Sequence, residues 1–166
     1  MADAERRRAL EQRRRELQER SRLQPEVRGI KRTLDYFVAH GIPYTLERDP
    51  AEGPANWVIQ HFPYVGYTWV RLDWERVSGA VRGPDMAAPE PEVIAWFDAL
   101  EAAGRIGDCE VVLITDNGGD PMIHVRFADI RAHPGICQQD GRIWWIVCLS
   151  GRWVIQQGDG EPWWWG

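Results

Sequence analysis

Two carboxylates separated by one residue are the first candidates for chemistry in this chain. Asp73 and Glu75 lie in an alternating polar and apolar segment, so on a strand they would share a face with Arg71. Paired carboxylates can perform acid–base chemistry or bind a metal ion. A nuclease site built on such a pair would also need a lysine two residues after the second acid, where this chain has Val77. We therefore interpret these residues as a charged strand face with short-range ion pairs rather than as a catalytic or metal site.

A second acidic pair, Asp116 and Asp120, surrounds the residues Asn-Gly-Gly. Calcium loops also carry closely spaced acids, but this spacing does not match the twelve-residue EF-hand pattern and no glutamate stands at the required offset. Asn-Gly and Gly-Gly are turn formers. The segment therefore predicts the turn of a β-hairpin.

The histidines and cysteines form no recognisable site. None of the spacings typical of zinc ligands, disulfide frameworks or nucleophile motifs occurs, so no metal, cofactor or catalytic group is expected. A dyad of His124 with Cys109 or Cys137 is an open alternative that no motif supports. All three cysteines are interpreted as reduced thiols, because their number is odd and because the predicted sheet separates Cys137 from Cys148. The residues concerned are His40, His61, His124, His133, Cys109, Cys137 and Cys148.

Tryptophan is unusually abundant, with 10 in the chain. Three of them, Trp163, Trp164 and Trp165, are consecutive, and consecutive side chains point in different directions. We expect at least one of these rings to be exposed or docked in a groove, as at protein interfaces, where tryptophan is enriched. The alternative is a C-terminal segment that folds back over the sheet. The candidate partner-binding residues are Trp163, Trp164, Trp165, Trp69, Arg71, Asp73 and Glu75.

Charge separates two parts of the chain. Residues 1–24 have a net charge of +3 and residues 25–166 a net charge of −8. Residues 2–23 contain good helix formers and few apolar residues, which predicts a charged helical extension that could contact an acidic partner or a second subunit. The acidic body disfavours nucleic acid, because binding to nucleic acid depends on neutralising phosphates.

Two amphipathic helices are predicted, each beginning at a proline and ending at a glycine. The first runs from Pro25 to Gly41 and the second from Pro91 to Gly104. Their apolar stripes have helical spacing. The stripe residues are Val27, Ile30, Leu34, Phe37 and Val38 in the first helix, and Val93, Trp96, Phe97 and Leu100 in the second.

The remaining apolar segments predict strands. A hairpin is expected over residues 142–157, with Ser150 and Gly151 as its loop and Cys148 opposite Trp153. Its first strand is apolar on both faces and should be central, whereas the second should be half-solvated. Residues 78–91 predict a long loop, residues 128–132 a short helical turn, and residues 158–166 a tail that leaves the sheet. The other predicted strands cover residues 43–48, 56–62, 67–74, 110–115, 121–127 and 136–138.

Together these elements predict an α+β domain over residues 25–166, in which an antiparallel sheet of six to eight strands packs against two helices. In topology and charge alone, the α-β-β-β-α-β-β order from the second helix onward resembles the small acidic chaperones of type III secretion, and the tryptophan-rich strands at the end depart from it. The resemblance implies a chaperone-like role.

The expected function is a non-catalytic protein-binding module, such as a bacterial inhibitor, immunity protein or chaperone, with a basic protein as one candidate partner. The alternative is a small-ligand or carbohydrate binder, or an enzyme with a dispersed site, built on a tryptophan-lined pocket. No apolar segment reaches membrane-spanning length and no secretory signal is recognised, so a cytoplasmic location is expected. A homodimer could form through the N-terminal helix or a sheet edge.

Overall fold

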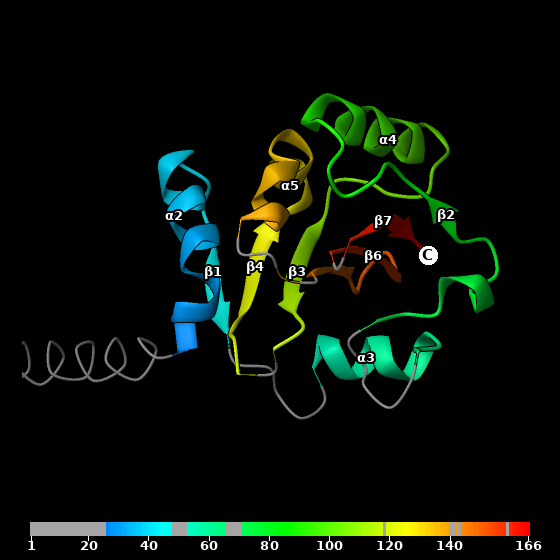
Figure 1. Ribbon diagram of the computed structural model, residues 1–166, viewed down its shortest axis with the longest axis horizontal. Coiled ribbons are helices and arrows are strands. Elements are labelled where there is room, and N and C mark those ends of the chain that lie inside the picture. Colours follow the sequence, from blue (N-terminus) through cyan, green and yellow to red (C-terminus); the bar gives the residue numbers. More distant parts are fainter. Residues whose placement is uncertain are drawn as a thin grey trace, which may run out of the picture.

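The computed structural model describes residues 26–47, 53–65, 71–117, 119–139, 142, 144–158 and 160–166. Its centre is a seven-stranded antiparallel sheet with the strand order β1-β4-β3-β5-β6-β7-β2 (Figure 1). The predicted α+β class with an antiparallel sheet is confirmed. The strands are β1 (Thr45–Glu47), β2 (Val81–Arg82), β3 (Glu110–Thr115), β4 (Met122–Arg126), β5 (Trp144–Cys148), β6 (Trp153–Gly158) and β7 (Glu161–Trp165).

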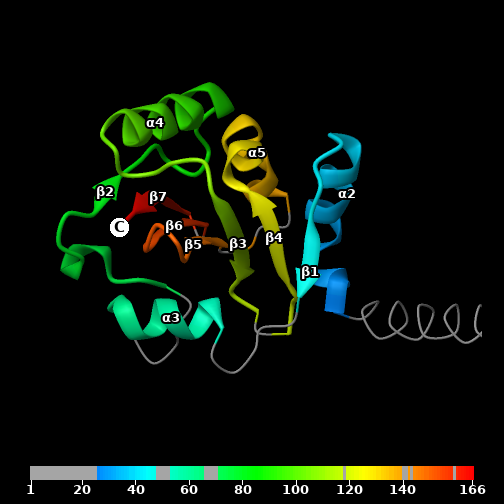
Figure 2. The same ribbon diagram turned by 180° about the vertical axis from the view of Figure 1, so that it is seen from behind.

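Helices cover both faces of this sheet, and Figures 1 and 2 show α4 and α3 on opposite sides of it. One face packs against α2 (Lys31–Ala39), α4 (Glu90–Ala102), α5 (Phe127–Ala132) and the 3-10 helices η1 (Glu26–Ile30) and η3 (Pro134–Gln138). The other face packs against α3 (Pro54–His61) and the 3-10 helix η2 (Trp74–Arg76). The side chains of β3, β5 and β6 alternate between these two apolar clusters, which is why both faces of the central strands are buried.

The two predicted helices are confirmed with small changes. Phe37 of α2 and Phe97 of α4 are fully buried, as their stripes predict. Val38 was expected on the apolar face of the first helix, but its side chain is 71% exposed. The buried residues of this face are Ile30, Thr33 and Phe37, which follow one another at intervals of three and four positions, so Val38 falls outside the buried stripe.

The hairpin of β5 and β6 has the predicted register, with Cys148 opposite Trp153 and Ile146 opposite Ile155. Its loop is longer than predicted, since β5 ends at Cys148 and β6 begins at Trp153, and Arg152 in this loop has a left-handed backbone conformation with φ 55°. Gly151 leaves room for the neighbouring indole ring, because a Cβ atom there would lie 2.6 Å from Trp153 Nε1. β5 occupies the middle of the sheet, as its apolar character on both faces predicts.

The predicted C-terminal tail is strand β7, so the prediction that residues 158–166 leave the sheet is wrong. Gln156 of β6 pairs with Trp164, and β2 pairs with the outer side of β7. The predicted loop 78–91 therefore contains a short edge strand. Gln156 is buried, and its side chain accepts a hydrogen bond from the Leu72 amide, so the half-solvated strand expected there does not occur.

Two predicted strands near residue 60 are also corrected. Residues 56–62 lie in and just after helix α3, which begins with Pro54 at its first turn and buries Ala55 and Val58 one helical turn apart. A short apolar run cannot distinguish a strand from a buried helix. Of the predicted strand 67–74, residues 67–70 lie outside the described residues, and Leu72 forms an isolated bridge with Tyr64.

The third corrected strand is 136–138, which lies within η3, a 3-10 helix that begins at Pro134. A strand here would have placed Cys137 opposite Trp144, but the partners of Trp144 in the sheet are Thr115 and Gln157. Helix α3 also removes the β-β-β order on which the resemblance to secretion chaperones rested. The charged extension predicted for residues 1–24 lies outside the described residues.

Candidate functional site

The charged residues singled out in the sequence line a pocket of about 350 Å³ between β7 and the segment around η2. We call it the acidic tryptophan pocket. Arg71, Asp73 and Glu75 come from the segment around η2, and Trp164 comes from β7. The complete lining is Val65, Arg71, Leu72, Asp73, Trp74, Glu75, Glu161 and Trp164.

Two tryptophans form the aromatic wall of this pocket. The rings of Trp74 and Trp164 are stacked, with their centroids 5.9 Å apart and their planes 6° apart. Trp74 is buried and Trp164 is half-buried. The buried ring of Trp74 therefore supports the ring of Trp164, which a ligand can contact. The segment before η2 is attached to the sheet where the Leu72 amide donates a 2.9 Å hydrogen bond to Gln156 Oε1. The position of the aromatic wall therefore depends on β6 and β7.

The pocket is acidic, with three carboxylates against one guanidinium in its lining. Arg71 is paired with Glu161 at 2.8 Å, and Asp73 lies 3.9 Å from Arg76 just outside the pocket. Glu75 is exposed. A cation entering the pocket would meet the acidic groups and the aromatic wall together, which is the arrangement that favours binding of a guanidinium or ammonium group.

Apolar side chains adjoin the acidic tryptophan pocket. Val65, which lines the pocket, is 46% exposed, and the neighbouring Tyr64 is 43% exposed. Exposed apolar groups next to charged groups are typical of protein-binding surfaces. The candidate protein-binding surface therefore includes Tyr64 and Val65 as well as the acidic tryptophan pocket.

The three consecutive tryptophans have different environments. Trp163 is fully buried on the side of the sheet covered by α4, Trp164 faces the pocket, and Trp165 is half-buried with the Arg105 guanidinium 4.9 Å from its ring centroid. Of the predicted binding residues, Trp164, Arg71, Asp73 and Glu75 come together, whereas Trp163 is a core residue. Trp69 lies outside the described residues. Glu161 is not among the predicted binding residues, because the sequence predicts a tail that leaves the sheet.

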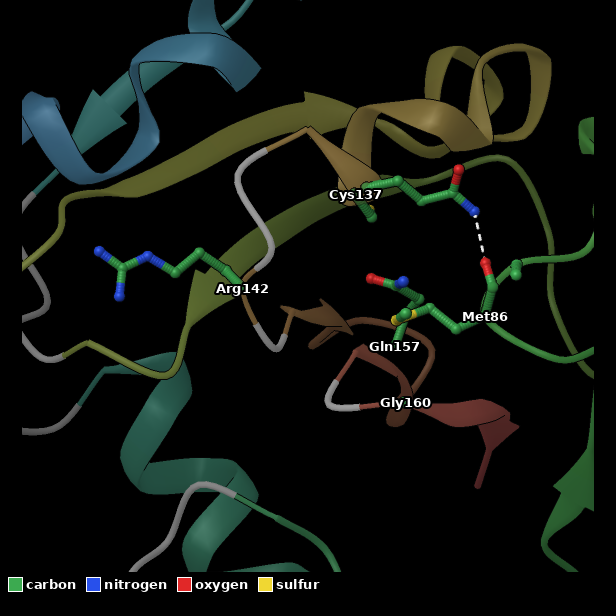
Figure 3. Close-up of a pocket in the computed structure, with 7 residues that line it drawn as sticks. Met86, Cys137, Arg142, Gln157 and Gly160 are labelled. Atoms are coloured by element: carbon green, nitrogen blue, oxygen red, sulfur yellow. Dashed lines mark hydrogen bonds between the residues drawn. The ribbon is translucent and has the colours of Figure 1, made fainter.

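A second cavity, of about 420 Å³, lies between η3 and the turn that joins β6 and β7 (Figure 3). Its lining includes Met86, Cys137, Gln138 and Gln157 but no tryptophan. Gln138 donates a 2.8 Å hydrogen bond to the Met86 carbonyl across it. The guanidinium of Arg142 points away from Cys137 and Gln157 (Figure 3). This cavity does not fit the tryptophan-lined ligand site that the sequence suggested.

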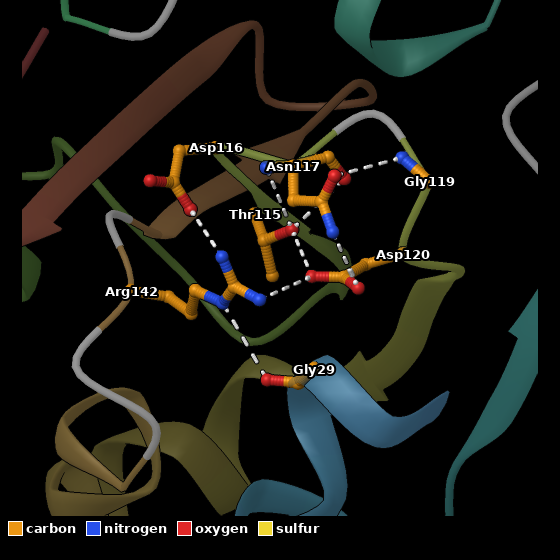
Figure 4. Close-up of polar contacts among 7 residues, drawn as sticks. All are labelled: Gly29, Thr115, Asp116, Asn117, Gly119, Asp120 and Arg142. Atoms are coloured by element: carbon orange, nitrogen blue, oxygen red, sulfur yellow. Dashed lines mark hydrogen bonds and ion pairs between the residues drawn. The ribbon is translucent and has the colours of Figure 1, made fainter. Parts of the chain in front are cut away.

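The acidic pair of the β3–β4 turn belongs to a polar network centred on Arg142 (Figure 4). The Arg142 guanidinium lies 3.8 Å from Asp116 and 3.9 Å from Asp120. Asp120, whose side chain is 3% exposed, also accepts a 2.8 Å hydrogen bond from the Thr115 hydroxyl and a 3.0 Å bond from the Asn117 amide. The predicted hairpin turn is confirmed. Its acids connect the turn to the segment preceding β5.

Gly29 of η1 packs directly against this network, and its carbonyl oxygen lies 3.5 Å from Arg142 Nε. A Cβ atom at Gly29 would lie 2.5 Å from Asp120 Oδ1 and 2.7 Å from Arg142 Nη2. We expect Gly29→Ala to lower the free energy of unfolding by about 1–3 kcal/mol, because the hydrogen-bonded carboxylate has to move. Urea denaturation measures the change. Gly107→Ala is the matched control, since a Cβ atom at this exposed position meets nothing within 4 Å, and equal losses in both variants would contradict the steric argument.

Two of the histidines, His124 and His40, have structural partners. His124 lies between Glu47 at 2.9 Å and Glu110 at 3.3 Å, at the β1 edge of the sheet. His40 follows α2 at its C-terminal cap, as its position in the sequence suggests. Across the described part of the chain, no group of three or more His, Cys, Asp or Glu side chains could hold a metal ion.

Cys109 and Cys148 are close neighbours, with their sulfur atoms 2.9 Å apart. This contact is not predicted from the sequence, where the predicted sheet separates only Cys137 from Cys148. Cys137 lies separately in η3, where burial raises the pKa of its thiol to about 12.

None of the described helices is both long and apolar enough to cross a membrane. Comparison of the chain with known protein families, curated proteins and solved structures found no match.

Proposed function

We propose that this protein is a non-catalytic protein-binding module, of the inhibitor, immunity-protein or chaperone type, whose acidic tryptophan pocket receives a basic side chain of its partner. One observation carries the proposal: three carboxylates and a stacked tryptophan pair line the same pocket. This pocket brings together four of the residues that the sequence alone singles out for partner binding.

The chemistry of the pocket supports a cationic occupant. Carboxylates form strong charge-assisted hydrogen bonds with guanidinium and ammonium groups, and the face of an indole ring attracts a cation. The protein itself contains such a contact between a cation and an indole ring. Arg105 lies over the ring of Trp165, next to Trp164 in the chain. An arginine or lysine from a partner would make both interactions at Trp164.

Charge and shape around the pocket support a protein rather than an isolated cation. The net charge of −8 on residues 25–166 would steer a basic protein toward the surface. Tyr64 and Val65 would then add apolar contacts beside the pocket. An aromatic anchor surrounded by apolar and charged groups is the usual composition of an interface hot spot.

The proposal is tested by charge reversal at the pocket. Affinity capture from the source organism, repeated at high salt, supplies a candidate partner, which is then purified and titrated against the protein. Glu75→Lys is expected to weaken that complex about 10- to 100-fold, because a cation then repels the incoming basic group. Glu92→Lys is the matched control: it changes net charge equally but lies exposed on α4, outside the pocket.

A partner-derived peptide separates pocket binding from general charge attraction. We expect an arginine-containing peptide to bind more tightly than the same peptide with citrulline, which keeps the shape and loses the charge. Equal weakening by Glu75→Lys and Glu92→Lys, or equal affinity for the two peptides, would show that the pocket is not the recognition site.

A small-ligand or carbohydrate binder is the second candidate, because a volume of about 350 Å³ falls within the range of ligand pockets and Trp164 could stack on a sugar ring. A thermal-shift screen with metabolites and glycans tests it. A stabilising hit that disappears in Trp164→Ala would favour this candidate over the protein-binding module.

A further inference from the structure

Two cysteines meet where neighbouring strands of the sheet end. Cys109 immediately precedes β3, and Cys148 is the last residue of β5, the antiparallel neighbour of β3. Their sulfur atoms are 2.9 Å apart although the residues are 39 positions apart in the chain. Cys148 is buried and Cys109 is half-buried, so the pair has one protected thiol and one that solvent reaches.

We propose that Cys109 and Cys148 form a site of reversible oxidation, at which a small-molecule disulfide of the glutathione class converts the two thiols into an intramolecular disulfide. The bonded S–S distance is about 2.05 Å, so the sulfur atoms need to approach by only about 0.9 Å. Movements of this size are within the reach of side-chain rotation at the ends of two strands.

The reaction is a balanced exchange in two steps. The Cys109 thiolate, formed by loss of its proton to solvent, attacks one sulfur of oxidised glutathione, which releases one glutathione thiolate and leaves a mixed disulfide. Cys148, after losing its proton, attacks the Cys109 sulfur and releases the second glutathione thiolate. The protein loses two electrons and two protons, and the oxidised glutathione is reduced to two glutathione molecules.

The surroundings of Cys148 favour the second step. The Gly151 amide donates a hydrogen bond to Cys148 Sγ at 3.2 Å, and Ser150 Oγ lies 3.4 Å from the same sulfur. Both groups hold the Cys148 sulfur beside Cys109. The resolving thiol is therefore in place before the mixed disulfide forms.

Protonation sets the rate of the first step. Burial, followed by the hydrogen bond with Cys148, raises the pKa of Cys109 to about 12. Far below this pKa, the thiolate fraction increases tenfold for each pH unit. The initial rate of disulfide formation should thus rise about tenfold per unit between pH 7 and pH 9.

The experiment uses the full chain, incubated with oxidised glutathione and analysed by intact-mass spectrometry and peptide mapping without reductant. We expect loss of two hydrogen atoms, a peptide linked through Cys109 and Cys148, and reversal by dithiothreitol. The new covalent loop should raise Tm by roughly 5–15 °C. Cys137→Ser should still form the bond, whereas Cys109→Ser should remain unlinked and Cys148→Ser should stop at a glutathione adduct on Cys109.

Three outcomes would overturn the proposal. They are a glutathione adduct on Cys109 of the unchanged protein that persists without ring closure, three free thiols after prolonged exposure at pH 9, and a linked peptide that contains Cys137. The pair lies with the core cluster on the side of the sheet opposite the acidic tryptophan pocket. Failure of this test therefore leaves the proposed partner binding untouched.

Discussion

Replacing Trp163 by alanine is expected to lower the free energy of unfolding by about 3–5 kcal/mol. The side chain is fully buried, and its ring lies edge-on to Phe97, with 5.5 Å between centroids, and 6.3 Å from the ring of Trp96. Both partners belong to α4, so the substitution leaves a cavity between this helix and β7. Urea denaturation followed by far-UV circular dichroism measures the loss.

Trp164→Ala provides the matched control, because it removes the same side chain from the next position of the same strand. Trp164 is half-buried, and we expect a loss of about 1–2 kcal/mol with the fold retained. For partner affinity the proposed function predicts the reverse order. Under conditions in which both variants are folded, Trp164→Ala should weaken partner binding more than Trp163→Ala. Equal destabilisation by the two substitutions would contradict the buried position of Trp163.

Alkaline pH is expected to destabilise the protein through Cys137. Burial raises the pKa of this thiol from 9.0 to about 12, so above pH 9 the unfolded chain has lost a proton that the folded chain retains. Unfolding then releases a proton, and the free energy of unfolding should fall by about 1.4 kcal/mol per pH unit from this group between pH 9 and pH 12. Below pH 9 the thiol is protonated in both states and contributes no slope.

The contribution of Cys137 is isolated by comparison with Cys137→Ala. This variant is expected to be less stable at pH 7, because a buried sulfur atom is lost, but its free energy of unfolding should fall less steeply above pH 9. Other alkaline groups titrate in both proteins and cancel in the difference. Parallel curves for the two proteins up to pH 11 would show that the Cys137 thiol ionises normally in the folded state.

Elements with strong local signals were correctly predicted from the sequence. The turn residues between Asp116 and Asp120 define the β3–β4 hairpin, and alternation around Ser150 sets the register of β5 and β6. The α4 stripe likewise identifies its buried residues, Val93, Phe97 and Leu100. In each case residues close in sequence interact with one another, so spacing alone carries the information.

The candidate site was predicted only in part. Arg71, Asp73 and Glu75 are close in sequence and were grouped correctly, although Glu75 belongs to η2 rather than to a strand. Glu161 and the stacking of Trp74 on Trp164 were missed, because both depend on where β7 lies. The contact between Cys109 and Cys148 was missed for the same kind of reason, since it arises from the pairing of β3 with β5.

By itself, the sequence determined the antiparallel α+β class, the central hairpin, the amphipathic helices and the acidic character of the body. Tertiary structure decided that residues 54–61 are a helix and that the tail is a strand. Pro162 has no backbone N–H to donate to a neighbouring strand, which disfavours a strand here. The structure accommodates it, because the pairing of β6 with β7 shifts register beside Pro162 and β2 pairs only with Trp164 and Trp165. Burial against residues far away in the chain outweighs weak local preference in such segments, so only the folded structure brings the pocket and the cysteine pair together.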